Sequence, residues 1–356
     1  MKERRLGTIS IAAMYLGAIL GAGFASGREC WQFFGVFGNR GYRGIIFTTI
    51  LFVALALMLT YIARCRKTAD LGKLVCPTDS PVLGRFIGYV IGATYYTLII
   101  SMSAAGGSLL NQQLGWDTHI GGIIIVVLVL ATVFGNFERL SRIFSKIMPF
   151  VFLIGIVTIV LVLCSDDFHQ SGATSGFQPS EMAPVWWFSG FVFAAYNSLG
   201  FITMAGESAL LAKDTKTAYR GALLGAVLPC LMTVLLLMVL RKDMAYSASL
   251  DLPMLGYSFR ISSLLSAVYA VILYCSIYAT ASSTFYGFST RLPENRWKKP
   301  ILVVAAFIGY GIGLSGFKKL VAYLYPPQGY VGLIIMAMIA VNFVRCIREN
   351  NKNSHN

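Results

Sequence analysis

Long apolar stretches recur along the whole chain and restrict it to a helical fold inside a membrane. A transmembrane helix needs about 20 consecutive, mainly apolar residues. Ten such stretches are present, at residues 8–36, 41–63, 83–110, 119–135, 143–164, 185–211, 217–240, 259–290, 300–314 and 328–347. Hydrophobic residues make up 56% of the 356 residues and charged residues only 12%, whereas a soluble domain carries about 25% charged residues. The sequence therefore predicts an all-α integral membrane protein with ten transmembrane helices.

The placement of basic residues gives these helices an orientation. Basic residues stay on the cytoplasmic side of membrane proteins, mainly in the short loops next to the helices. With the N-terminus placed inside, 21 of the 29 Lys and Arg residues fall on the cytoplasmic side and 8 on the other. We therefore expect a multi-pass protein with both termini in the cytoplasm. The net charge of +14 then reflects orientation in a lipid bilayer, and we expect no nucleic-acid partner.

The chain contains no stretch that could form a separate soluble domain. The longest polar segment has about 20 residues, from Ser165 to Pro184. Residues 1–356 are therefore expected to form one transmembrane domain that ends in a cytoplasmic tail at 348–356. An enzyme inside the membrane would need a cluster of carboxylates, histidines or nucleophiles at that depth. Only Glu29 and Glu207 qualify, on distant segments, so we expect no enzyme activity.

The first predicted helix contains four glycines in eleven residues, at positions 17, 21, 23 and 27. Each glycine costs about 1 kcal/mol relative to alanine inside a helix. One explanation is close helix packing through two G-xxx-G patterns. A dinucleotide-binding loop is a second, but the last glycine spacing is wrong and no strand precedes it. The third is an unwound segment, which fits the abrupt change to Arg28 and Glu29.

The sixth predicted helix is interrupted at a matching place. Asn197, Ser198 and Gly200 break an otherwise apolar run; Asn and Ser compete for backbone hydrogen bonds, or act as polar contacts between helices. The two interruptions lie about 175 residues apart, half of the chain, and five helices per half give the halves opposite orientations. Such matching interruptions indicate the binding site of a secondary transporter. We predict a 5+5 inverted repeat, with repeats at about 8–164 and 185–347 and with helices one and six unwound.

The segment Gly21-Ala-Gly-Phe-Ala-Ser-Gly-Arg-Glu-Cys-Trp-Gln-Phe-Phe34 resembles the opening signature of the YkvI-like bacterial membrane proteins. That family is grouped with the amino acid-polyamine-cation (APC) superfamily. The resemblance implies the LeuT-type fold of that superfamily, a place in the bacterial inner membrane, and secondary active transport by alternating access. Ser198-Leu-Gly-Phe201 is also similar to the unwound segment in helix six of the neurotransmitter:sodium symporters.

Unwound segments leave backbone groups without partners at each half-helix end. Free N–H groups near Phe24–Gly27 suit a carboxylate, and carbonyls of Ala195–Ser198 suit an ammonium group. A small amino acid or related zwitterion would satisfy both. In the symporters a tyrosine of helix three contacts the substrate carboxylate, and Tyr96 or Tyr95 resembles it. The predicted substrate-binding residues are Gly21, Gly23, Phe24, Ala25, Ser26, Tyr96, Tyr196, Asn197, Ser198 and Phe201.

The same resemblance implies a possible sodium ion and no other cofactor. Sodium-coupled members of the fold hold one ion between carbonyls of helix one and hydroxyls of helix eight. Helix eight here reads Ala279-Thr-Ala-Ser-Ser-Thr284, which is similar to the family pattern. The implied ligands are Gly17, Leu20, Ala279, Ser282 and Ser283. The alternative is that the two serines bond to their own helix. A second sodium site looks absent, because Phe24 replaces the expected asparagine.

Three ionisable residues are candidates for gating or coupling: Arg28, Glu29 and Glu207. Arg28 lies near the outer-gate arginine of the symporters, although the residues that follow it depart from their pattern. Arg28 and Glu29 point about 100° apart on a helix, so they cannot simply pair. Proton coupling through a glutamate is the rival to sodium coupling. A sensor that binds an amino acid without transporting it is the rival to a transporter.

Overall fold

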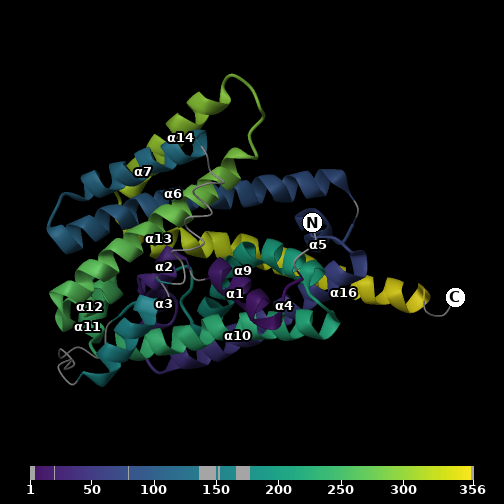
Figure 1. The fold of residues 1–356 in the computed structure, drawn as a ribbon, viewed down its shortest axis with the longest axis horizontal. Coiled ribbons are helices and arrows are strands. Elements are labelled where there is room, and N and C mark those ends of the chain that lie inside the picture. Colours follow the sequence, from purple (N-terminus) through teal and green to yellow (C-terminus); the bar gives the residue numbers. More distant parts are fainter. Residues whose placement is uncertain are drawn as a thin grey trace.

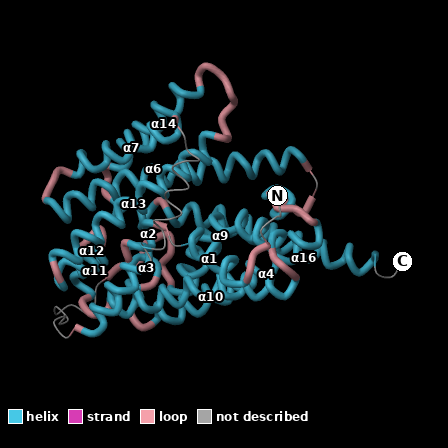
Figure 2. Tube along the Cα trace, in the orientation of Figure 1, coloured by secondary structure: helices cyan, strands magenta, loops and turns pink. Residues whose placement is uncertain are grey.

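The computed structural model describes residues 5–19, 21–78, 80–135, 150, 153–165 and 177–353. Within these ranges the regular secondary structure is helical, apart from one isolated β-bridge between Leu6 and Ala212. Figure 1 shows long helices in two groups, and Figure 2 shows the loops that join them. The two chain ends lie toward the same end of the molecule, which we call the terminal end, and α11 and α12 lie at the other. The prediction of an all-α protein is confirmed.

Each of the ten apolar stretches contains helix in the described residues. The helices are α1 (Thr8–Ile19), α2 (Ala22–Ala25) and α3 (Arg28–Phe33) in the first stretch, then α4 (Arg40–Arg66), α6 (Pro81–Leu114), α7 (Thr118–Phe134), Leu153–Cys164, α9 (Trp186–Leu211), α10 (Thr215–Leu240), α13 (Ser263–Ser289), α14 (Lys298–Gly313) and α16 (Tyr325–Asn353). By length and apolar composition alone, five described helices could cross a membrane, or six if the bent α9 counts as one span. The last helix continues through most of the predicted tail.

Short helices occur in the predicted loops or at the ends of predicted helices. They are η1 (Gly35–Phe37), α5 (Leu71–Val75), α11 (Met244–Ser249), α12 (Pro253–Ile261) and α15 (Phe317–Tyr323). They are too short for a search that looks for membrane-spanning lengths. Two of them begin at aspartate caps, since Asp70 Oδ1 accepts a hydrogen bond from the Lys73 amide at 2.9 Å and Asp243 Oδ1 from the Tyr246 amide at 3.0 Å. Such caps satisfy amides that a helix leaves free at its start.

The long helices pack as two groups, which Figure 1 shows one above the other. Helices α1, α4, α9 and α10 pack against one another, with α16 along α9 and α4, whereas α6, α7, α13 and α14 form the second group. Glycines permit close approach within each group. A Cβ at Gly190 of α9 would lie 2.9 Å from Gly44 O of α4, and one at Gly121 of α7 would lie 2.4 Å from Gly106 O of α6. The short helix α2, in the first predicted helix, contacts α13 of the second group.

The sixth predicted helix, α9, differs from the prediction that it is unwound. Helix α9 stays helical through Asn197–Gly200 and is instead bent by 58° between Gly200 and Met204. Asn197 Nδ2 donates a hydrogen bond to Phe193 O at 3.0 Å, and Ser198 Oγ donates to Ala195 O at 2.7 Å. The polar side chains therefore bond to their own helix, a pattern known to bend helices. The prediction of an unwound segment is wrong here, and a bend takes its place.

Candidate functional site

The first predicted helix is broken at two points, in the segment where its glycines cluster. Helix α1 ends at Ile19, and Gly21 has an extended backbone (φ −78°, ψ −175°) before the single turn of α2. Gly27 then adopts a left-handed conformation with φ +79°, and α3 begins at Arg28. Glycine adopts this conformation without a steric penalty. The break therefore consists of two kinks that flank one turn of helix, and we call residues 21–27 the helix-one break.

Two of the four glycines have a steric reason to be there. A Cβ at Gly23 would lie 1.9 Å from Glu29 Oε1, and one at Gly27 would lie 2.9 Å from Met254 Cγ. At Gly21 the contact would be an ordinary 3.7 Å to Thr280 Oγ1, and at Gly17 no described residue comes within 4 Å. Close packing of a neighbouring helix therefore does not account for Gly17, whereas Gly23 is required so that a carboxylate can reach the break.

The carbonyl groups that the break frees are largely held by other parts of the protein. Tyr269 of α13 donates its hydroxyl to Ala25 O at 2.6 Å, and the Met254 amide of α12 donates to Ser26 O at 3.0 Å. The Ser26 hydroxyl donates to Gly23 O at 2.6 Å and accepts from the Arg28 amide at 3.2 Å. These bonds fix the geometry of the break. In this conformation the carbonyls of Ala25 and Ser26 are therefore engaged by the protein.

A buried carboxylate lies at the centre of the site. Glu29 is only 4% exposed, and its Oε1 lies against Gly23 as described above. The Tyr196 hydroxyl of α9 lies beside the Glu29 carboxylate, and Tyr325 of α16 interacts with the same group. The two tyrosine rings stack with centroids 4.9 Å apart, and Ser101 of α6 is a polar neighbour of Tyr325. Three helical segments from distant parts of the chain, α3, α9 and α16, thus meet around one acidic group, and α6 contacts one of its neighbours.

Arg28 belongs to a second polar cluster, at the end of the molecule opposite the termini. Its side chain is 2% exposed; Nη1 donates to Leu250 O at 3.2 Å and Nη2 to Gln32 Oε1 at 3.4 Å. Asp251 interacts electrostatically with this guanidinium and accepts a hydrogen bond from Ser108 of α6 at 2.6 Å. The adjacent side chains of Arg28 and Glu29 thus point into different clusters, as their angular separation on a helix predicts. Arg28 ties α3 to the segment between α11 and α12.

The residues suggested as sodium ligands are only partly brought together. The Ser282 hydroxyl is buried and has no hydrogen-bond partner, while the Ser283 hydroxyl donates to Ala279 O at 2.8 Å and Thr280 O at 3.1 Å. Ser283 and Gly17 are exposed, and Leu20 lies outside the described residues. Bonding to its own helix therefore accounts for Ser283 and leaves Ser282 available. Within the described ranges, no group of three or more His, Cys, Asp or Glu residues could hold a metal ion.

Three other predicted site residues do not join the break. The Tyr96 hydroxyl donates to Ala305 O of α14 at 2.9 Å, and Tyr95 packs against Gly287 of α13. Glu207 is exposed on the last part of α9. The side chain of Phe201 lies outside the described part of the structure. Conversely, sequence reasoning missed Tyr325, Ser101 and Tyr269, because single polar or aromatic residues in apolar helices carry no positional signal of their own.

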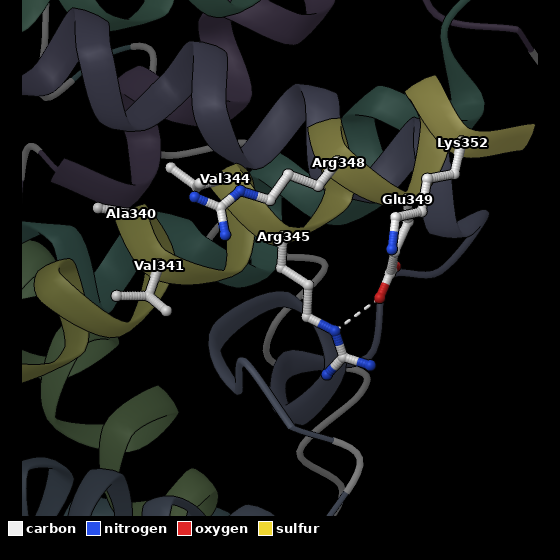
Figure 3. A pocket seen from close by; sticks show the side chains of 7 residues that line it. All are labelled: Ala340, Val341, Val344, Arg345, Arg348, Glu349 and Lys352. Carbon is white, nitrogen blue, oxygen red and sulfur yellow. Dashed lines mark hydrogen bonds and ion pairs between the residues drawn. The ribbon is translucent and has the colours of Figure 1, made fainter. Parts of the chain in front are cut away.

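Two pockets lie away from the break. One, of 60 Å³, is lined by Asp251, Ser108 and Tyr310 among others and has room for about two water molecules. The other, of 630 Å³, follows the C-terminal part of α16 and is lined by Arg345, Arg348, Glu349 and Lys352 with apolar neighbours (Figure 3). Its first lining residue, Ala340, is roughly 20 Å along the helix from Tyr325. Neither pocket is the site around Glu29.

Two proteins of Bacillus subtilis (strain 168) are similar to this chain along nearly its whole length. The membrane protein YkvI is 24% identical over 349 residues, which cover 95% of this chain and 97% of YkvI. The protein YyaD is 20% identical over 337 residues, covering 92% of this chain and 94% of YyaD. The names of both relatives describe them as uncharacterized. No family model matches the chain.

Solved structures resemble the chain only distantly. A manganese transporter of Eremococcus coleocola, in complex with an aromatic bis-isothiourea compound, is 15% identical with a TM-score of 0.46, covering 94% of this chain and 76% of that one. A mutant of the same transporter is 13% identical with a TM-score of 0.46, covering 93% and 76%. Likeness at this level establishes neither a common fold nor a common cargo. The similarity to YkvI over 95% of the chain confirms the resemblance of the opening segment, and together with the apolar helices it supports a multi-pass membrane protein that is similar to YkvI.

Proposed function

We propose that this protein is a secondary active transporter that moves a small amino acid or related zwitterion by alternating access. One observation carries the proposal: helix one is broken where the two helix groups meet. Non-helical backbone at membrane depth is tolerated only where it is buried in protein or lines a cavity. Transporters place their binding sites at such discontinuous helices, between their repeats.

The packing of the helices supports a 5+5 inverted repeat. In such a repeat, each helix has a counterpart five positions later, so α1, α4, α6 and α7 would correspond to α9, α10, α13 and α14. The contact of α4 with α9 is matched by the contact of α10 with α1, and that of α7 with α13 is matched by that of α14 with α6. These matched pairs are what two similar halves of opposite orientation would produce.

The contacts around the break resemble one of the two states that alternating access requires. At the end opposite the termini the break is bonded to neighbouring segments, through Ser26 to Met254 and through Arg28 to Leu250. At the level of Gly21, helix one contacts α13. One turn closer to the terminal end, no atom of the described residues lies within 4 Å of a Cβ placed on Gly17. This pattern supports a state that is closed at one end and open toward the terminal end.

A binding screen tests the substrate class. Purified protein is heated with each of the twenty standard amino acids, with and without sodium, because a bound ligand raises the apparent melting temperature. We expect a small group of amino acids to raise it in the wild type but not in Gly23→Leu, whose side chain would fill the space beside Glu29. The substrate class is wrong if no amino acid has this effect. Equal binding by Gly23→Leu would show that the break is not the site.

The coupling ion has two candidates, each with an observation in its favour. The buried, unpaired hydroxyl of Ser282 supports sodium, because sodium binds oxygen ligands. The buried carboxylate of Glu29 at the break supports a proton. Uptake into proteoliposomes distinguishes them when choline replaces sodium at fixed pH, in the wild type and in Ser282→Ala/Ser283→Ala. Loss of uptake in both cases supports sodium; sodium-independent uptake that rises with a pH gradient supports Glu29.

A further inference from the structure

We propose that the Glu29 carboxylate is the acceptor for the ammonium group of the substrate, and that it holds a proton when the site is empty. The inference rests on the proposed function and names the part of the substrate that the site recognises. It replaces the expectation that carbonyls of Ala195–Ser198 would hold the ammonium group. Those carbonyls belong to a continuous helix, and Ala195 O already accepts a hydrogen bond from Ser198.

Among the described residues, no basic side chain forms an ion pair with Glu29. Its basic neighbour in sequence, Arg28, points into the other cluster, and none of the ion pairs among the described residues involves Glu29. The titratable groups that face the carboxylate are Tyr196 from α9, Tyr325 from α16 and the adjacent Cys30. A carboxylate removed from water must be neutralised by a proton or by a cation. No described residue supplies a cation at this place, so an ion pair with Glu29 needs a cation from solution.

Two tyrosine hydroxyls make the site suitable for an ammonium ion. Tyr196 and Tyr325, whose rings stack on each other, have their hydroxyl groups beside the carboxylate, and a phenol oxygen can accept a hydrogen bond. The hydroxyl of Tyr325 is buried and makes no hydrogen bond of ordinary geometry. An ammonium group has three N–H donors. It can therefore donate to the carboxylate and to a phenol oxygen at once. A single proton on the carboxylate would leave the phenol oxygen without a donor.

The exchange at Glu29 balances in charge and atoms. The empty site carries a neutral carboxylic acid; when a substrate with an ammonium group enters, the acid releases one proton and the carboxylate pairs with the ammonium. On release, a proton returns to the carboxylate. Glu29 lies on α3, directly after the helix-one break. The exchange therefore takes place where the two helix groups meet. Bound substrate and bound proton therefore exclude each other.

Calorimetry with chemically edited ligands tests the inference. The probes are the amino acid that most raises the melting temperature, its methyl ester, which keeps the ammonium but lacks the carboxylate, and its N-acetyl derivative, which keeps only the carboxylate. Methylammonium chloride is a fourth probe. We expect the wild type to bind the amino acid and the ester and to release a proton, detected as a heat that depends on the buffer. We expect Glu29→Gln to bind at least tenfold more weakly with no proton release. Glu294→Gln, altered at an exposed glutamate, is the matched control.

The outcomes separate the inference from the proposed function. Binding of the N-acetyl derivative as tight as that of the amino acid overturns the inference, as does unchanged binding or proton release in Glu29→Gln. If no amino acid binds but methylammonium binds with proton release that depends on Glu29, the amino-acid class fails and the ammonium site stands. If neither methylammonium nor any amino acid binds the wild type, both fail. A melting temperature of Glu29→Gln equal to that of Glu294→Gln shows that the variant is folded.

Discussion

At the scale of single residues, Arg28 and Glu29 have different contacts because their side chains point in different directions. Arg28 and Glu29 are neighbours in sequence, yet one ties down a segment at the end opposite the termini and the other reaches the break. The sequence predicted Gly23, Ser26 and Glu29 as parts of the site, because glycine clusters and intramembrane charges are local signals. It could not predict Tyr325, since that contact joins residues nearly 300 positions apart.

The contact of Gly23 with Glu29 leads to a prediction. Replacing Gly23 by alanine places a methyl group where Glu29 Oε1 now lies, 1.9 Å from the new Cβ, so the carboxylate must move while the flexible side chain lets the fold persist. We expect binding of the screened amino acid to weaken at least tenfold, about 1.4 kcal/mol, as measured by calorimetry. Gly311→Ala on α14, where nothing lies within 4 Å, should bind normally. Normal binding by both variants would contradict the account.

At the scale of elements, the two interrupted helices behave differently although both contain glycine and polar residues. Helix one breaks because Gly21 and Gly27 adopt non-helical conformations that neighbouring residues support. Helix α9 stays helical because Asn197 and Ser198 turn their side chains back to their own carbonyls. The sequence shows only that a helix is weakened. Which weakened helix opens depends on partners from other helices, such as Tyr269 and Met254.

The left-handed glycine at the start of α3 gives a second prediction. Gly27→Ala forces a non-glycine residue to φ +79° and brings its Cβ to 2.9 Å from Met254 Cγ, whereas Gly115→Ala meets the strain of φ +70° with no atom within 4 Å. Such backbone strain costs about 1–3 kcal/mol. We expect Gly27→Ala to lower the apparent melting temperature more than Gly115→Ala does. An equal decrease would mean that α12 does not constrain the break.

At the scale of the whole molecule, the hydrophobic pattern predicted the positions of the helices well and their short connections poorly. All ten stretches contain helix in the described residues, because a long apolar run has few alternatives in a membrane. Helices α5, α11, α12 and α15 were missed, since they are shorter than a membrane span. The grouping of α1 with α10 and of α6 with α13 is not readable from any single segment, because it depends on pairs of helix surfaces.

Membrane topology provides a third prediction. Lys318 on α15 donates to Ala248 O on α11, far from the chain ends, and the 29 residues of α16 follow, about 44 Å of helix. That length exceeds the roughly 30 Å of a bilayer core. Reporter fusions after Lys319 and after Asn356 should therefore report opposite sides of the membrane, with the second one cytoplasmic. The same side for both would contradict the ten-helix arrangement.

Concentrative uptake distinguishes a transporter with its site at the helix-one break from a protein that only binds the amino acid. Proteoliposomes that contain the purified full chain are given the radiolabelled amino acid found by the binding screen, under imposed sodium and proton gradients. A transporter with its site at the helix-one break should accumulate the amino acid above the outside concentration with at least one gradient, and Gly23→Ala should not. Binding of the amino acid without any accumulation by the wild type would contradict transport and would identify the protein as a sensor.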